Sequence, residues 1–331
     1  MTASSRRLRM KKAETLRKIA EEVRTSRRFL ISAHENPEGD AIGSVLALNL
    51  ALNGMGKEAK VLNQDPTPAA LRFLPGAKEI IHRAPEGEGF DAAFALDCGD
   101  KKRLGLEFTR VQGIGKIINI DHHISNSHFG DINWVDPKAS STAEMIFELL
   151  SVLPVGMNQA IAENIYTGIL TDTGSFHYSN TSPKAFAVAR KCLLAGVDPW
   201  KVAEKIYETQ PLARLRLLPL VLETLEASDG GRISSVVVTQ RMMKQTGASP
   251  ALTEDFINFP RSLKGSEVAL LFREMDPKKY RVSLRSRGNV DVARVAKEFQ
   301  GGGHPSAAGC TVEGNLDKVR ALVLKRVKAA L

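Results

Sequence analysis

The segment Asp121-His122-His123 places a carboxylate and two imidazoles directly after the apolar run 116–120. This run has the length and the β-branched content of a buried parallel strand, so the three polar side chains stand at its carboxyl end. Open α/β sheets keep their active sites at that edge. A charged group in a core needs a partner. Metal binding is one interpretation of the triplet, and a solvated loop with two ordinary histidines is the other.

A second group of metal-type ligands follows the predicted strand 28–33. His34 comes first, and Glu38 and Asp40 follow within a turn that a proline and a glycine force to fold back. Carboxylate oxygens and imidazole nitrogens so close in sequence can converge on one cation. Taken alone, His34 also fits a strand-end histidine with a local hydrogen bond.

Two more carboxylates stand directly after predicted apolar segments of the chain. Asp97 ends the apolar run 91–96, and Asp172 follows the helical stretch 161–170. Asp97 suits a metal ligand shared between two ions, since the glycine at position 99 lets the backbone turn away. For each aspartate the alternative is an N-cap of a helix, and Asp100 suits that role equally well.

The elements that must position these residues alternate between strands and helices. An amphipathic lead-in helix is predicted over 11–24. Strands are predicted at 28–33, 58–62, 91–96 and 116–120. Further helices are predicted to end at about Asn53, to run from Ser140-Ser141 through Leu150, and to cover 161–170, 183–196 and 199–207. This order predicts an α/β fold with a parallel sheet. A leucine-rich helical stretch over 211–228, ended by Asp229-Gly230-Gly231, is predicted to connect to a second domain.

The second domain is predicted to contain strands at 233–239, 267–274 and 280–286 and a short helix over 291–299. A glycine loop follows at 301–309, in which Gly302, Gly303 and His304 offer backbone N–H groups and an imidazole. Arg285 and Arg287 precede the loop and can grip phosphate as guanidinium forks. A flexible turn is the alternative to a phosphate or nucleotide site.

Composition narrows the class of protein. The chain has 331 residues, 43% of them hydrophobic, and a formal net charge of +9, which favours phosphate-rich partners. Its three scattered cysteines fit neither a disulfide framework nor a CxxC zinc site, so we expect a reducing compartment, the cytoplasm. No apolar run approaches 18 residues, and none follows the basic start, so neither a membrane span nor a signal peptide is expected.

These residues resemble, in order, four motifs of the DHH phosphoesterase superfamily: His34 to Asp40, Asp97 to Asp100, Asp121 to His123, and Asp172 to Ser175. The glycine loop with Arg285 and Arg287 ahead of it resembles the DHHA1 substrate domain. The resemblance covers nearly the whole chain beyond residue 25. Its size and domain order are most similar to the NrnA-type oligoribonucleases that also act as pAp phosphatases.

The resemblance implies a parallel-sheet DHH domain and a smaller α/β DHHA1 domain with an active-site cleft between them. The boundaries expected are a lead-in helix at 1–27, a DHH catalytic domain at 28–209, a helical linker at 210–230 and a DHHA1 substrate-binding domain at 231–331. Two divalent cations are implied, with manganese as the expected metal. One would be held by His34, Glu38 and Asp97, and the other by Asp40, Asp97, His122 and Asp172.

The same resemblance assigns catalytic roles to Asp97, as the shared ligand, and to His123, which would face the substrate phosphate. Substrate binding falls to Arg285, Arg287, Gly302, Gly303 and His304. One residue departs from the motif, because the family usually has aspartate where this chain has Glu38. The extra methylene moves the carboxylate outward by about 1.5 Å, which implies a looser first site or a different metal preference.

The function predicted is the manganese-dependent hydrolysis of short RNA to mononucleotides, with dephosphorylation of pAp as a further activity. Short RNA and nucleotides are the partners expected, and a homodimer is an assembly left open. Two alternatives remain. One is a phosphodiesterase for linear or cyclic dinucleotides from the same superfamily, and the other is a non-catalytic nucleic-acid-binding protein. The latter requires lost ligands, and only Glu38 is altered.

Overall fold

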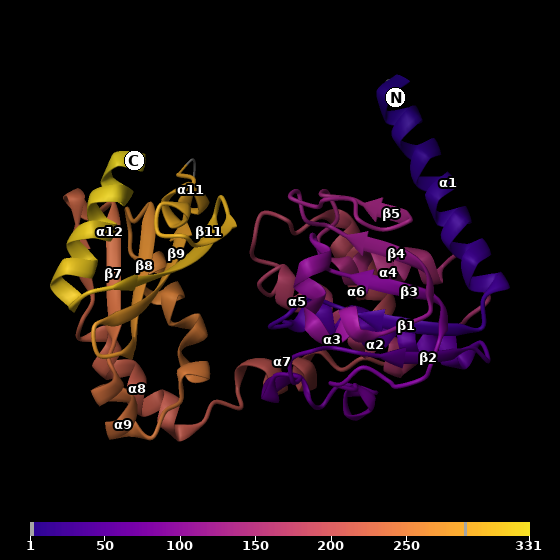
Figure 1. Ribbon diagram of the computed structural model, residues 1–331, viewed down its shortest axis with the longest axis horizontal. Helices are drawn as coiled ribbons and strands as arrows, with labels where there is room; N and C mark the ends of the chain where they lie inside the picture. Colours follow the sequence, from indigo (N-terminus) through magenta and orange to yellow (C-terminus); the bar gives the residue numbers. More distant parts are fainter. Residues whose placement is uncertain (1–2, 288–289) are drawn as a thin grey trace. The chain divides into compact units, whose positions relative to one another are not determined.

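The computed structural model describes residues 3–287 and 290–331 and divides into two compact units, 1–209 (unit 1) and 210–331 (unit 2) (Figure 1). The elements of unit 1 are α1 (Ala3–Thr25), β1 (Arg28–Ser32), α2 (Gly39–Gly54), β2 (Glu58–Val61), the 3-10 turns η1 (Ala69–Leu71) and η2 (Ala77–Glu79), β3 (Phe90–Leu96), η3 (Lys101–Leu104), α3 (Gly105–Arg110), β4 (Ile114–Asp121), β5 (Ile132–Val135), α4 (Thr142–Leu150), α5 (Gln159–Asp172), α6 (Pro183–Leu194) and α7 (Pro199–Tyr207).

Unit 1 is built on a parallel sheet with strand order β2-β1-β3-β4-β5. Phe94 and Ile118 belong to the large core between one sheet face and the helices α2, α4, α5 and α6. On the other face, Ala93 and Ala95 pack with Leu104 and Phe108 of η3 and α3. Both faces are covered, as the continuous apolar strands require. The α/β fold with a parallel sheet is therefore confirmed, and β5 is a strand that the sequence did not predict.

The strand order brings the predicted ligands together. Strands β1, β3 and β4 are direct neighbours, and each ends just before or at a residue of interest, His34, Asp97 and His122. Because the three strands are parallel, their carboxyl ends lie at one edge of the sheet. The helices α2, α4 and α5 bring further side chains to the same edge.

Unit 2 has its own sheet and its own helices. Its elements are α8 (Leu212–Leu222), β6 (Glu226–Ser228), η4 (Asp229–Gly231), β7 (Ile233–Val238), α9 (Gln240–Thr246), η5 (Pro250–Ile257), α10 (Asn258–Ser262), β8 (Val268–Asp276), β9 (Lys279–Ser286), α11 (Val292–Lys297), β10 (Gly302–His304), β11 (Ala307–Glu313) and α12 (Leu316–Ala330). The six strands run in the order β10-β11-β9-β8-β7-β6. One face packs against α11 and α12, and the other against α8, α9 and η5.

The stretch 210–230, for which a helical linker is predicted, packs with unit 2, since Leu217 and Val221 of α8 are buried with Val236 and Val238 of β7. Its end forms strand β6, paired with β7. The glycine loop 301–309 is not a loop, since β10 and β11 form an antiparallel pair within it.

Among the residues described, none of the helices combines the length and apolarity that crossing a bilayer requires.

Candidate active site

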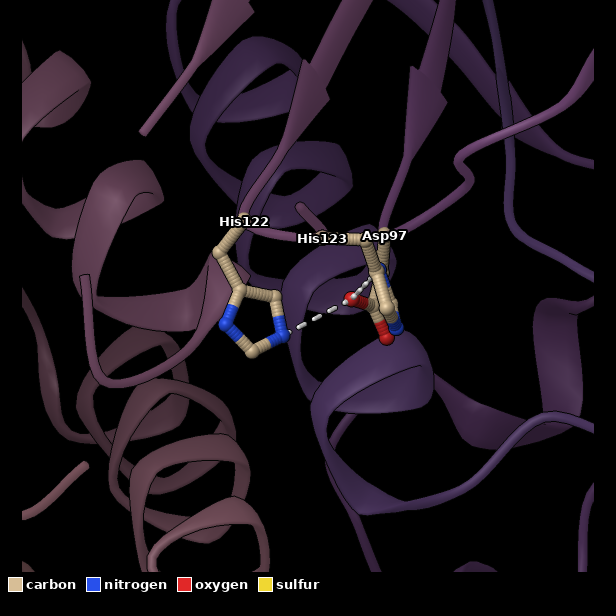
Figure 2. A group of neighbouring side chains, drawn as sticks. All are labelled: Asp97, His122 and His123. Atoms are coloured by element: carbon tan, nitrogen blue, oxygen red, sulfur yellow. Dashed lines mark ion pairs between the residues drawn. The ribbon is translucent and has the colours of Figure 1, made fainter. Parts of the chain in front are cut away.

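The carboxyl edge of the unit 1 sheet gathers the candidate ligands. Figure 2 shows Asp97, which directly follows β3, with the two histidines that follow β4, and ion pairs join its carboxylate to both rings. Nε2 of His122 lies 3.5 Å from Oδ1 of Asp97, and Nδ1 of His123 lies 3.7 Å from the same oxygen. The predicted cluster of strand-end groups is thus a feature of the fold.

The first predicted ligand group converges as a set. Ligand atoms of His34, Glu38 and Asp97 all lie within 4.8 Å of one another. Nε2 of His34 is 3.0 Å from Oε1 of Glu38 and 3.6 Å from Oδ2 of Asp97. The His34 and Asp97 side chains are buried, whereas the Glu38 side chain is 58% exposed. Glu38 therefore closes this group from the solvent side, which its longer side chain allows.

The second group brings Asp40, His122 and Asp172 together, again within 4.8 Å. Nε2 of His122 lies 3.8 Å from Oδ2 of Asp40 and 3.7 Å from Oδ2 of Asp172. Asp172 is the last residue of α5 and does not cap the start of a helix. Asp100, in contrast, does act as an N-cap, because its side chain accepts a hydrogen bond from the Lys102 N–H.

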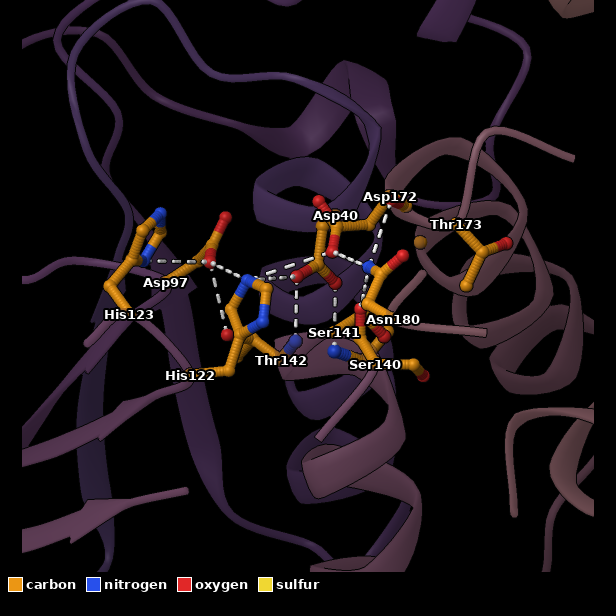
Figure 3. A network of polar contacts seen from close by, with 12 residues as sticks. Asp40, Asp97, His122, His123, Ser140, Ser141, Thr142, Asp172, Thr173 and Asn180 are labelled. Atoms are coloured by element: carbon orange, nitrogen blue, oxygen red, sulfur yellow. Dashed lines mark hydrogen bonds and ion pairs between the residues drawn. The ribbon is translucent and has the colours of Figure 1, made fainter. Parts of the chain in front are cut away.

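Among the described residues, only Asp97 has one side-chain oxygen facing each of the two groups. Oδ2 points to His34 of the first group, and Oδ1 points to His122 and accepts a hydrogen bond from the Thr142 hydroxyl at 3.1 Å (Figure 3). Oδ2 is buried and has no hydrogen-bond partner among the described residues. A buried carboxylate oxygen without a donor is costly unless a cation or a proton meets it. The backbone of Asp97 is left-handed, with φ of 53°.

The start of α4 holds Asp40. Its Oδ2 accepts the Thr142 N–H at 2.6 Å and its Oδ1 accepts the Ala143 N–H at 2.8 Å. These N–H groups are unpaired at a helix N-terminus, where the helix dipole also favours a negative charge. Ser141 caps α4 by accepting from the Glu144 N–H, at the point where a helix was predicted to begin.

Close contact between helices α2 and α5 sets the spacing of their two carboxylates. A Cβ added to Gly168 would lie 2.5 Å from the Cβ of Ala143 and 2.9 Å from Oδ1 of Asp40. A Cβ added to Gly43 would clash with the carbonyl oxygen of Asn164. Only glycine at these positions lets the helices approach so closely, and the approach brings Asp40 of α2 near Asp172 of α5.

The electrostatics of the cluster depend on charges of both signs at short range. Burial opposes protonation of His34, but two neighbouring carboxylates outweigh it and raise the pKa of His34 to about 10. The pKa of His122 is raised to about 9 for the same reason, against burial. Burial, with the Asp97 charge, raises the pKa of Asp40 well above its usual range, and burial raises that of Asp172 to about 7. Burial opposes the ionisation of Asp97, yet His34 and His122 keep its pKa low.

These shifts arise because several carboxylates and imidazoles share one buried space, so that each carboxylate favours a proton on a neighbouring ring. No lysine or arginine forms an ion pair with Asp40, Asp97 or Asp172 in the described part of the chain. Protonated imidazoles meet the carboxylates instead. Divalent cations would replace these protons, and mixed carboxylate and imidazole donors suit zinc, iron or manganese. The donor set therefore fits metal ions, and so does the buried Asp97 oxygen that accepts no hydrogen bond from the described residues.

His123 differs from His122 in its partner. Its Nδ1 lies 2.6 Å from Oδ1 of Asp121, closer than the 3.7 Å that separates it from Asp97. His123 also belongs to a third possible donor group, with Asp97 and His122. The shorter contact with Asp121 occupies Nδ1, so this geometry favours the prediction that His123 is not a metal ligand.

The residues predicted to bind substrate lie in unit 2. Arg285 is half-buried on β9 and is paired in register with Ala307 of β11, and Arg287 is exposed just beyond β9. Gly302 and Gly303 belong to β10, the edge strand next to β11. An edge strand leaves part of its backbone N–H groups without a strand partner, and the role of Gly302 and Gly303 as backbone donors stays a prediction. The side chain of His304 lies outside what the structure describes.

Several polar residues at the site were not predicted from the sequence. Thr142 bonds to Asp97, and Asn180 donates to Oδ2 of Asp172 at 3.1 Å and to the Ser140 carbonyl at 2.8 Å. Asn126 donates to Asp121 at 2.6 Å. All three residues lie in loops or at a helix start that folds back onto the strand ends. The only local sequence signal near them is the spacing of Ser141 and Glu144, which marks the start of the helix that contains Thr142.

Comparison with protein families places this geometry in a known context. Residues 28–169 match the DHH family, N-terminal domain, and residues 234–330 match the DHHA1 domain. The chain is 37% identical over 305 residues to the bifunctional oligoribonuclease and PAP phosphatase NrnA of Thermus thermophilus, covering 91% of this chain and 89% of the relative. The protein of the same name from Bacillus subtilis is 28% identical, with 86% of this chain and 89% of the relative covered.

A solved structure shares the whole architecture. It is described as an exopolyphosphatase-related protein from Bacteroides fragilis, and it superposes with a TM-score of 0.90 at 28% identity. The match covers 96% of each chain. The similarity thus includes both units.

Proposed function

Because this chain belongs to the DHH phosphoesterase family and carries a DHHA1 domain, we propose that it hydrolyses short oligoribonucleotides to mononucleotides and removes the 3′ phosphate of pAp. Relatives named for both activities match this chain over nearly its full length. The observation that carries the proposal is Asp97, a buried carboxylate with one oxygen toward each of two complete donor groups.

The metal site in this proposal holds two divalent cations, with manganese as the metal. His34, Glu38 and Asp97 would hold the first, and Asp40, Asp97, His122 and Asp172 the second. Such a pair of ions supplies positive charge against the charge that develops on the phosphoryl oxygens and makes a water more acidic. The proposed ligands come from three strand ends and two helices, so the fold itself would position these residues to hold the two ions.

The remaining residues of unit 1 act on the substrate and on the ligands. His123 would contact the substrate phosphate and hold a proton at one of the phosphate oxygens. Thr142 and the first N–H groups of α4 keep Asp97 and Asp40 in place through the hydrogen bonds described above. Asn180 orients Asp172 in the same way. Each of these bonds lowers the cost of arranging the ligands before substrate binds.

Unit 2 is proposed to bind the substrate phosphates. Arg285 and Arg287 would donate paired N–H groups to phosphate, which a guanidinium matches better than a lysine does. Gly302 and Gly303 would offer backbone N–H groups at the sheet edge, and His304 an imidazole. That both units contact one substrate molecule, in a cleft between them, stays a prediction, and so do the domain boundaries at residues 27, 209 and 230.

Product analysis tests this proposal directly. A 5′-labelled diribonucleotide and pAp are each incubated with the protein and manganese, and the products are identified by mass spectrometry. Mononucleotides from the first and AMP from the second are expected. A protein that binds RNA but releases neither product would instead be the non-catalytic alternative.

RNA length is the second test. Relatives of this chain are named oligoribonucleases, and by this resemblance the rate should fall as RNA grows from two to about ten residues. A ladder of 5′-labelled RNAs on a sequencing gel measures this. A flat or rising profile would indicate a nuclease for long chains, and a preference for cyclic or linear dinucleotides alone would favour the phosphodiesterase alternative.

The proposal also includes a cytoplasmic location and leaves a homodimer as the assembly to be tested. All three cysteines, Cys98, Cys192 and Cys310, are buried free thiols, which suits a reducing compartment. Light scattering coupled to size exclusion would give the mass in solution, to be compared with 36.1 kDa for one chain.

A further inference from the structure

Asp121 precedes the two histidines, yet it belongs to none of the three donor groups. Its side chain is completely buried, and both of its oxygens are engaged. Oδ1 lies 2.6 Å from Nδ1 of His123, and Oδ2 accepts from Nδ2 of Asn126 at 2.6 Å. A buried carboxylate with this pair of contacts is arranged to hold an imidazole, not an ion.

Backbone groups determine which atoms donate and which accept in these contacts. Nδ2 of Asn119 donates to the carbonyl oxygens of Ala95 and Cys98, at 3.1 and 3.0 Å, and a carbonyl can only accept. Oδ1 of Asn119 therefore faces Nδ2 of Asn126, at 2.8 Å.

A second backbone group fixes the amide of Asn126 from its other side. Oδ1 of Asn126 accepts the His128 N–H at 2.7 Å. The amide cannot be turned over without losing this bond and setting two oxygens against each other. Nδ2 of Asn126 must therefore donate, and residue 121 must accept from it.

We propose that Asn126 and Asp121 are positioning residues that keep a hydrogen on Nδ1 of His123 and direct Nε2 to the substrate phosphate. This inference rests on the proposed function, in which His123 meets that phosphate. The role follows because Asp121 offers only acceptors, so Nδ1 of His123 must be the donor. The ring nitrogen that Asp121 does not hold is then Nε2.

Asp121→Asn separates this role from a purely structural one. With the Asn126 amide fixed, the new side chain must turn its oxygen to Asn126 and its NH₂ group to His123, so Nδ1 would have to accept and Nε2 would carry the hydrogen. The side chain keeps its size. We expect kcat on the diribonucleotide to fall roughly 10²-fold or more, with KM and manganese content unchanged. Asp131→Asn is the matched control, since Asp131 also accepts a hydrogen bond, from the Ile117 N–H, but lies on the exposed surface.

A double-mutant cycle decides whether Asp121 acts through His123. In a His123→Ala background, Asp121→Asn should change kcat less than about twofold, because the ring to be oriented is absent. Asn126→Leu, which removes the donor and the fixed polarity, should follow the same pattern with a smaller loss. Equal losses of kcat with and without His123, or a loss of bound manganese in Asp121→Asn, would overturn the proposal.

A spectroscopic measurement keeps this test independent of the proposed function. Two-bond ¹H–¹⁵N correlation spectra of the imidazoles, recorded on the full chain with magnesium in place of paramagnetic manganese, report which ring nitrogen carries hydrogen. His123 is assigned by its loss in His123→Ala. Nδ1 should be protonated in the wild type and unprotonated in Asp121→Asn, and identical rings in the two proteins would refute the inference. If the wild type cleaves neither diribonucleotide nor pAp, the proposed function fails, while these spectra still test the orientation of His123.

Discussion

The candidate ligands of unit 1 are fixed at the carboxyl ends of three parallel strands and are mostly buried, whereas the candidate substrate residues of unit 2 lie on an edge hairpin and the strand beside it. Buried donors have few other positions to adopt, because backbone N–H groups and hydroxyls hold them on several sides. Residues on an edge hairpin have more conformational freedom. We therefore expect substitutions in unit 1 to act on metal binding and kcat, and those in unit 2 to act on KM.

The largest effect should come from Asp97. Asp97→Ala removes the one carboxylate shared by both donor groups, so both metal sites weaken together and the rate on a diribonucleotide should fall at least about 10³-fold. The fold should survive, as judged by circular dichroism. A purified variant that keeps more than a few per cent of the wild-type rate would contradict the two-metal assignment.

A pair of glycine substitutions sharpens the contrast between the units. Gly168→Ala sets a methyl group against Ala143 and Asp40, and Gly303→Ala sets one against the Ala307 carbonyl at a φ of 143°. Either overpacking costs about 1–3 kcal/mol of stability. Gly168→Ala should also lower kcat about tenfold and weaken manganese binding, since Asp40 moves. Gly303→Ala should raise KM with manganese content unchanged, and a lowered manganese content there would break the comparison.

Arg285 tests the phosphate contacts of unit 2 alone. Arg285→Ala should lower kcat/KM roughly 10- to 100-fold, mainly through KM, because a hydrogen bond to a charged group contributes about 1.5–3 kcal/mol. Manganese content should not change. Arg326→Ala is the control, since it removes an equal charge from α12, where Arg326 pairs with Glu298. If both variants lose the same activity, the effect reflects net charge and not a specific contact.

The smallest effect is expected from Glu38→Asp, a conservative change at the one predicted ligand with a mostly exposed side chain. Glu38→Asp should tighten the first site, so that half-maximal activity needs a few-fold less manganese, because the shorter side chain suits the family motif that this chain resembles. Glu38→Ala should lose most activity. Manganese titrations of the three proteins compare them. An alanine variant as active as the wild type would show that Glu38 is not a ligand.

The sequence predicted unit 1 better than unit 2 for a physical reason. Long apolar strands followed by Asp97 or His122 are local patterns, and parallel pairing alone then brings their ends together. Gly301 to Gly309 carry no side-chain alternation, so the β10–β11 pair could not be told from a loop. Strands β5 and β6 were missed because each is short, with only four and three residues.

The positioning residues were beyond sequence reasoning. Asn126 and Asn180 stand in polar loops with no spacing that marks them, and their partners depend on where the loops return in space. The α2–α5 contact was likewise hidden, since nothing local distinguishes Gly168 from any helical glycine. Ligand types were predictable from chemistry, but the bonds that hold them were not.

The left-handed backbone of Asp97 has a consequence for directed evolution of this protein. A non-glycine residue at a φ of 53° stores conformational strain of order 1–3 kcal/mol, although aspartate tolerates it better than most residues. Glycine at position 97 would relieve that backbone strain, and asparagine there would remove the buried charge. A library selected for thermal tolerance alone should therefore drift away from aspartate at this position and lose turnover while its melting temperature rises, so heat screening needs a simultaneous selection for activity.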